Sequence, residues 1–182
     1  MGWILLAVLG ALVVWGISLY NRLVTLRNSG AGAWSDIDVQ LKRRWELIPN
    51  LVETAKGYAR HEQSTFEKVT AARSQAMQAH TPLEHAAAEG NLQGALKSLF
   101  AVAEAYPELR ANENFLGLQR ELSGLEDAIQ NARRYYNAIV RDLNTAIESF
   151  PGNLLAGPFG FSKREYFELD SDAERSVPSV RF

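Results

Sequence analysis

Residues that commonly do chemistry in proteins are sparse in this chain. It contains no cysteine, which excludes disulfides, thiolate metal ligands and cysteine nucleophiles. It has three histidines, and His61 lacks the second histidine four residues later that a zinc-protease helix needs. His80 and His85 flank a predicted turn, where they could share a metal ion or be ordinary polar residues of an exposed loop. We expect the second.

Other catalytic patterns are also missing from the sequence. There is no glycine-rich phosphate loop and no nucleophile elbow. Asp36 and Asp38 are two residues apart, so on a helix they point to different sides and make a poor acid–base pair. We therefore predict no catalytic residue, no metal ligand and no cofactor. The alternative is a metal-dependent or enzymatic factor at a membrane, which only His80 and His85 favour.

Two sets of polar residues are candidates for protein–protein contacts. Lys42, Arg43 and Arg44 form a basic run, which a straight helix would place about 33 Å beyond Tyr20 and thus several Debye lengths from a membrane at that residue. We expect this run to be a solvated face or to pair with carboxylates of a neighbouring helix or subunit. A second set consists of two pairs whose members are seven residues apart, Arg134 with Arg141 and Asn137 with Asn144. These residues lie either at the edge of a helix seam or in a contact between subunits.

These residues must be positioned by helices, and the first helix is a predicted membrane anchor over residues 1–21. Trp3 to Tyr20 holds no charged residue and spans roughly 27 Å as a helix, enough for the hydrocarbon core of a bilayer. No lysine or arginine precedes it and no small-x-small cleavage site follows it, so we expect an uncleaved anchor rather than a signal peptide. Arg22 and Arg27 on the C-terminal flank predict a cytoplasmic body.

Small residues gather on one side of this anchor. Ala7, Ala11 and Ser18 share a helical face, with Gly10 beside it. Such residues let transmembrane helices approach closely, although alanine and glycine are also simply common in membrane spans. This face is our candidate for packing between copies of the anchor.

The segment 22–33 is a predicted hinge. Gly30 and Gly32 each weaken a helix by roughly 1 kcal/mol, so we expect the helix to break between the anchor and the body.

Helical periodicity then covers residues 34–151. A first apolar face begins at Trp34, with a kink expected at Pro49, because proline removes the hydrogen bond to the Trp45 carbonyl. A second helix is predicted over 63–79 and a third over 92–106. Thr81, Pro82 and Glu84 predict a helix start. A turn predicted at 89–91 would end that helix after about two turns.

The last helix has the strongest pattern. Its apolar residues step by three and four positions over five heptads: Phe115, Leu118, Leu122, Leu125, Ile129, Ala132, Tyr136, Ile139, Leu143, Ala146 and Phe150. A helix with one such seam must bury it against other helices, which predicts coiled-coil-like packing in a bundle.

The C-terminal tail, 152–182, is rich in aromatic residues and has no helical period. Phe159, Phe161, Tyr166, Phe167 and Phe182 lie among polar residues, glycine and proline. The tail either packs along the bundle or docks onto a partner or a membrane. We expect it to pack on the bundle, because this many free aromatic side chains would promote aggregation.

Several of these segments together resemble the LemA family. The central stretch AWSDIDVQLKRRWELIPNLVETAKGYARHE at 33–62 carries most of the likeness, supported by LFAVAEAYPELRANENF at 99–115 and ARRYYNAIVRDLNTAIESFP at 132–151. The chain departs from the family at 29–32, where family members have bulkier residues. The resemblance implies a single N-terminal membrane span followed by an up-and-down four-helix bundle, and it implies no enzymatic activity.

The sequence therefore predicts an all-α, membrane-anchored interaction or scaffold protein that assembles with copies of itself. Expected partners are the lipid bilayer, further copies of the chain and other membrane proteins. Lys+Arg 19 against Asp+Glu 21 gives a net charge of -2, so no basic surface for nucleic acid is predicted. The expected location is the cell membrane, with one span and a cytoplasmic body.

Overall fold

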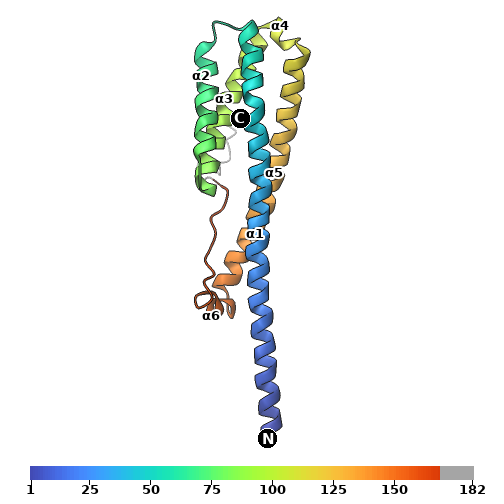
Figure 1. The fold of residues 1–182 in the computed structure, drawn as a ribbon, viewed down its shortest axis with the longest axis vertical. Coiled ribbons are helices and arrows are strands. Elements are labelled where there is room, and N and C mark those ends of the chain that lie inside the picture. Colours follow the sequence, from blue (N-terminus) through green and yellow to red (C-terminus); the bar gives the residue numbers. More distant parts are fainter. Residues whose placement is uncertain (169–182) are drawn as a thin grey trace, which may run out of the picture. The chain divides into compact units, whose positions relative to one another are not determined.

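The computed structural model describes residues 1–168, and that part of the chain contains helices and no strand. The helices are α1 (Gly2–Tyr58), α2 (Gln63–Gln78), α3 (Pro82–Ala105), α4 (Pro107–Arg110), α5 (Glu113–Glu148) and α6 (Gly152–Ala156) (Figure 1). The all-α class and the long apolar N-terminal helix are confirmed. The four-helix, up-and-down arrangement stays a prediction. The tail from residue 169 onward, Phe182 included, lies outside the described residues.

The described chain divides into two compact units. The first unit contains residues 1–44 and 121–166, and the second contains residues 45–120 and 167–168. α1 and α5 each contribute to both units, and the two units are described separately below.

α1 is one uninterrupted helix through the predicted hinge, as its ribbon shows (Figure 1). The expected break at Gly30 and Gly32 is therefore wrong. Leu23, Ala33 and Ile37 are buried on one side of α1 around these glycines. Burial of this apolar stripe offsets the roughly 1 kcal/mol that each glycine costs a helix. Gly30 also provides room, because a Cβ atom there would lie 3.3 Å from Nη1 of Arg164.

The first unit buries the α1 stripe and the C-terminal part of the α5 seam. In α5 its buried apolar side chains are Leu122, Ile129, Tyr136, Ile139, Val140 and Leu143. The heptad pattern thus identified the buried side of α5, with one exception at its end. α5 stops at Glu148, and Phe150 lies beyond it with 77% of its surface exposed.

In the second unit α2 and α3 pack side by side (Figure 1). Phe66 and Val69 of α2 are buried, as are Leu92, Leu96 and Leu99 of α3. Met77, near the end of α2, is exposed.

The start of α3 forms the predicted capping box. The Glu84 N–H donates to Oγ1 of Thr81, and the Glu84 carboxylate accepts from the Thr81 N–H. Backbone N–H groups of His80 and Thr81 lower the pKa of Glu84, because they stabilise its charged form. The predicted turn at 89–91 is wrong, since α3 continues to Ala105 with Glu89 buried inside it.

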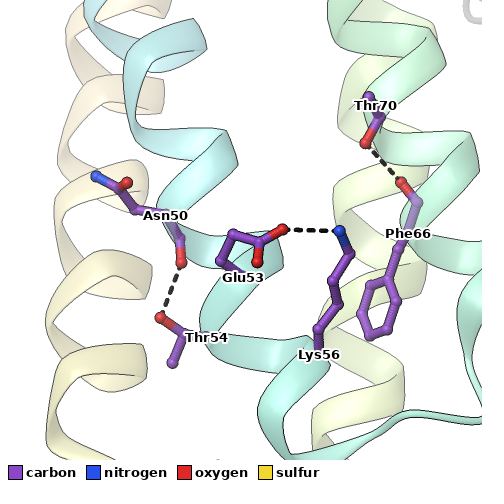
Figure 2. Close-up of polar contacts among 6 residues, drawn as sticks. All are labelled: Asn50, Glu53, Thr54, Lys56, Phe66 and Thr70. Carbon is purple, nitrogen blue, oxygen red and sulfur yellow. Dashed lines mark hydrogen bonds and ion pairs between the residues drawn. The ribbon is translucent and has the colours of Figure 1, made fainter.

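Polar side chains near the end of α1 and the start of α2 bond within their own helices. Thr54 donates to the Asn50 carbonyl at 2.8 Å, and Thr70 donates to the Phe66 carbonyl at 2.9 Å (Figure 2). Lys56 pairs with Glu53 at 2.7 Å on the exposed side of α1. These contacts let hydroxyl and charged groups remain in helices without partners from other elements.

Candidate functional site

The first candidate region surrounds Trp45 in the second unit. Pro49 has no N–H, so the carbonyl oxygen of Trp45 lacks its usual helical donor. Nε of Arg73 in α2 donates to this oxygen at 2.6 Å. A charged donor from a neighbouring helix thus replaces the hydrogen bond that proline removes, and α1 continues past Pro49.

The side chain of Trp45 joins α1 to α3. Its Nε1 donates to a Glu89 carboxylate oxygen at 2.7 Å, and both residues are buried. The indole ring stacks on the ring of His85, with centroids 6.1 Å apart and planes 11° from parallel. His85 is thus a buried packing residue, contrary to the expected exposed loop position. His80 is exposed at the turn before α3. Among residues 1–168, no group of three or more His, Cys, Asp or Glu side chains is arranged to hold a metal ion.

The basic run predicted for interactions divides between interior and surface. Arg44 is buried, with Nη2 3.0 Å from a carboxylate oxygen of Glu126 in α5. Lys42 is exposed and pairs with Asp38 of its own helix at 2.6 Å, and Arg43 is exposed. Pairing with a neighbouring helix therefore occurs within the chain at Arg44. Lys42 and Arg43 remain available at the surface.

The α5 set divides in the same way. Arg134 and Arg141 are exposed, and they contact Asn131 and Asp142 of their own helix. Asn137 is half-buried. Asn144 is buried: its Nδ2 donates to the Arg164 carbonyl and its Oδ1 accepts from the Arg164 N–H, both at 2.9 Å. Asn144 is therefore an internal residue that holds the tail, not a surface residue as the interaction hypothesis required.

The tail residues 157–166 are attached to the first unit by further contacts. Burial raises the pKa of Tyr136, whose protonated hydroxyl donates to the Glu165 carbonyl at 2.9 Å. Phe161 is buried with Leu23 of α1 and Ala156 of α6. The guanidinium carbon of Arg27 lies 5.2 Å from the centroid of the Phe161 ring, a cation–π contact.

Residues 2–18 of the anchor make no comparable packing. Ala7, Gly10, Ala11 and Ser18 are exposed, as are the large apolar side chains around them, such as Leu9 and Val13. Among the described residues, α1 is the helix that is long and apolar enough to cross a membrane by length and composition. The exposure of its small-residue face leaves that face available to another helix.

A cavity that the sequence did not indicate lies where the anchor ends. It has a volume of about 480 Å³ and lies between α1, the end of α5 and the start of α6. Its polar lining consists of Arg22, Arg141, Asp142, Thr145 and Ser149, and its apolar lining includes Leu19 and Phe150. The one available sequence signal was Arg22, the first charged side chain after the apolar stretch.

The fold and these sites define an all-α, membrane-associated protein whose first helix begins with an apolar, exposed segment. The model of the LemA family matches residues 33–182, which is most of the sequence. The chain therefore belongs to the LemA family, and the resemblance seen in its motifs is confirmed.

Individual relatives agree with this assignment. The chain is 28% identical to magnetosome protein MamQ 2 of Paramagnetospirillum magneticum over 175 residues, covering 82% of the chain and 64% of the relative. It is 27% identical to magnetosome protein MamQ of Magnetospirillum gryphiswaldense, covering 81% and 64%. It is 31% identical to protein LemA of Metamycoplasma hominis, covering 75% and 63%. The chain thus spans just under two thirds of the length of these relatives.

Proposed function

We propose that this chain is a membrane-anchored, non-catalytic scaffold that assembles with copies of itself on the membrane. The observation that carries the proposal is the two-part character of α1. Its first residues are apolar and exposed, whereas residues from Leu23 onward form a stripe buried by the rest of the chain. One continuous helix therefore joins the proposed membrane span to residues that pack in the helical body. The magnetosome proteins among its relatives, named for a cellular structure rather than a reaction, support a structural role.

Two surfaces support self-assembly. The exposed small residues of the anchor can let spans pack closely, with an expected contribution of about 1 kcal/mol or less. Lys42, Arg43 and Arg134 are exposed on the body and can meet carboxylates of another copy. Exposed ion pairs contribute about 0–1 kcal/mol each, so several must act together. Confinement to a membrane raises the effective concentration for such weak contacts.

We expect full-length protein in lipid discs or mild detergent to form a homo-oligomer that salt weakens. A chain starting at residue 21 should be a monomer or a small oligomer, because it loses the anchor and its confinement. We choose residue 21 as the start because a chain that begins after residue 23 would lack Leu23, which packs against Phe161. Mass photometry of both proteins at low and high salt measures the difference.

A pair of matched substitutions tests the anchor surface. Gly10→Leu adds bulk beside the small-residue face, and we expect it to weaken assembly up to about fivefold. Gly16→Leu makes the same change on the side of the helix opposite Ala7 and should have little effect. Full-length protein that stays monomeric in both discs and detergent would contradict self-assembly.

We also expect the body to lie in the cytoplasm. Arg22 and Arg27 follow the span, and basic residues beside a span favour the cytoplasmic side of the membrane. Protease added outside intact cells should leave the body whole, and the same protease should digest it after lysis. Digestion of the body in intact cells would reverse the orientation.

A further inference from the structure

The cavity at the end of the anchor lies at a defined depth if α1 spans the membrane. Leu19 lines it from the last turn of the uncharged stretch, and Arg22 lines it from the next turn, about 5 Å further along the helix axis. Tyr20, between these residues, contacts the ring of Phe159 with centroids 5.1 Å apart. Aromatic side chains at the end of a span mark the headgroup layer of a bilayer. The cavity is therefore expected at the level of the lipid phosphates.

The lining of the cavity suits a phosphodiester. Arg22 and Arg141 provide two guanidinium groups, which bind phosphate oxygens through several N–H donors. Asp142 also lines the cavity and lies 3.5 Å from Nε of Arg141, so two positive charges and one negative charge leave one net positive charge. The hydroxyl groups of Thr145 and Ser149 add neutral hydrogen-bonding partners. This charge complements a ligand that carries one negative charge.

Exposed apolar side chains occur in the chain segment that lines the cavity. Phe150 lines the cavity and is 77% exposed, and Leu154 and Phe159, a few residues further along the chain, are 63% and 55% exposed. The same segment contains α6, whose Ala156 is buried in a cluster with Leu23 of α1 and Phe161. Apolar side chains at this depth can lie against the upper parts of acyl chains, as in interfacial membrane-binding segments.

We propose that this cavity binds the headgroup of an anionic phospholipid, with its phosphate between Arg22 and Arg141 and its acyl chains along Leu19 and Phe150. The site rests on the proposed membrane span, because only the span places the cavity among headgroups. Its volume of about 480 Å³ lies within the usual range of small-ligand sites. The anionic headgroup distinguishes this ligand from the zwitterionic lipids of the same layer.

The test uses full-length protein and two lipids, phosphatidylglycerol and phosphatidylcholine. Native mass spectrometry of the detergent-solubilised protein, titrated with each lipid, should show tighter binding of phosphatidylglycerol. We expect Arg22→Gln and Arg141→Gln each to weaken its binding about fivefold, and the double variant about 25-fold, because a cation near a lipid surface contributes about 1 kcal/mol. Arg141→Lys keeps the charge and should retain most of the affinity.

Two comparisons show whether a loss of lipid binding comes from the site itself rather than from a change in total charge or in membrane orientation. Arg60→Gln makes the same charge change at an exposed position in the loop after α1 and should leave lipid binding unchanged. Arg141→Gln does not alter the charges that flank the span, so it keeps the membrane orientation. Equal binding of both lipids, or an equal loss in Arg60→Gln, would overturn the proposal.

Three further outcomes separate the possible failures. If millimolar inorganic phosphate binds the wild-type protein, the double variant loses this binding, and phosphatidylglycerol binds no better than phosphatidylcholine, the site takes a soluble anion and the lipid proposal is wrong. Extraction of the membrane-bound protein by alkali would instead contradict the span itself, and with it the depth argument. Protein that resists alkali but shows no preference for phosphatidylglycerol contradicts the lipid site alone and leaves the scaffold proposal standing.

Discussion

Replacing Phe161 with alanine should lower the free energy of unfolding by about 3–5 kcal/mol and release the C-terminal segment from the first unit. The ring is only 6% exposed and packs with Leu23 and Ala156. The centroids of the Phe161 and Tyr20 rings are 5.7 Å apart in an edge-to-face arrangement, and the Arg27 guanidinium carbon lies 5.2 Å from the Phe161 centroid. Alanine would leave a cavity at this point and remove both ring contacts.

The measurement is thermal unfolding in detergent combined with limited trypsin digestion. Release of the segment should expose Lys163 and Arg164 to trypsin faster than in the wild type. Both are held in the wild type, Lys163 by an ion pair with Glu148 and the backbone of Arg164 by Asn144.

Phe159→Ala is the matched control for this substitution. It deletes the same ring from the same segment, but Phe159 is 55% exposed, so we expect a loss of about 1 kcal/mol or less. Equal losses from both variants would show that burial of Phe161 does not hold the segment. That result would favour the alternative in which the tail serves mainly to dock onto a partner.

Replacing Arg73 with methionine should cost about 1.5–3 kcal/mol, because the Trp45 carbonyl would lose a charged hydrogen-bond donor. Methionine keeps much of the apolar stem of arginine, so the substitution tests the hydrogen bond more than the packing. Chemical denaturation of the full-length protein in detergent measures the change. Lys68→Met, at an exposed position of the same helix, should have little effect.

The cause of this cost can be isolated with Pro49→Ala. Alanine restores an N–H at position 49, so the Trp45 carbonyl regains its helical partner within α1. In this background Arg73→Met should cost much less than in the wild type, which gives a coupling of about 1–2 kcal/mol in a double-mutant cycle. An equal cost in both backgrounds would show that Arg73 does not compensate for the proline.

Local sequence was sufficient for features that depend on neighbouring residues. The apolar, uncharged run of α1, the capping box at Thr81 and the three-and-four spacing of α5 each depend on residues within a few turns of one another. The LemA-like motifs identified the family, which the match over residues 33–182 confirms.

Interactions between distant residues decided what local rules could not. Helix propensity predicts a break near Gly30 and a kink at Pro49. Burial of a long stripe and a donor from Arg73 keep α1 continuous. Propensity contributes only about 1 kcal/mol per glycine, whereas packing acts along the whole helix.

The same reasoning applies to the individual polar and aromatic residues. The sequence left open whether Arg44 faces solvent or pairs with a neighbouring helix or subunit, and whether Asn144 lies at a seam edge or in a subunit contact. Each finds a partner within the chain, Arg44 at Glu126 and Asn144 at Arg164. Phe159 and Phe161 stand two positions apart in a segment without helical period, so their sequence could not say which is buried. The tertiary structure decides this, because only Phe161 lies in the cluster of Leu23 and Ala156, while Phe159 remains more than half exposed at the end of the apolar helix.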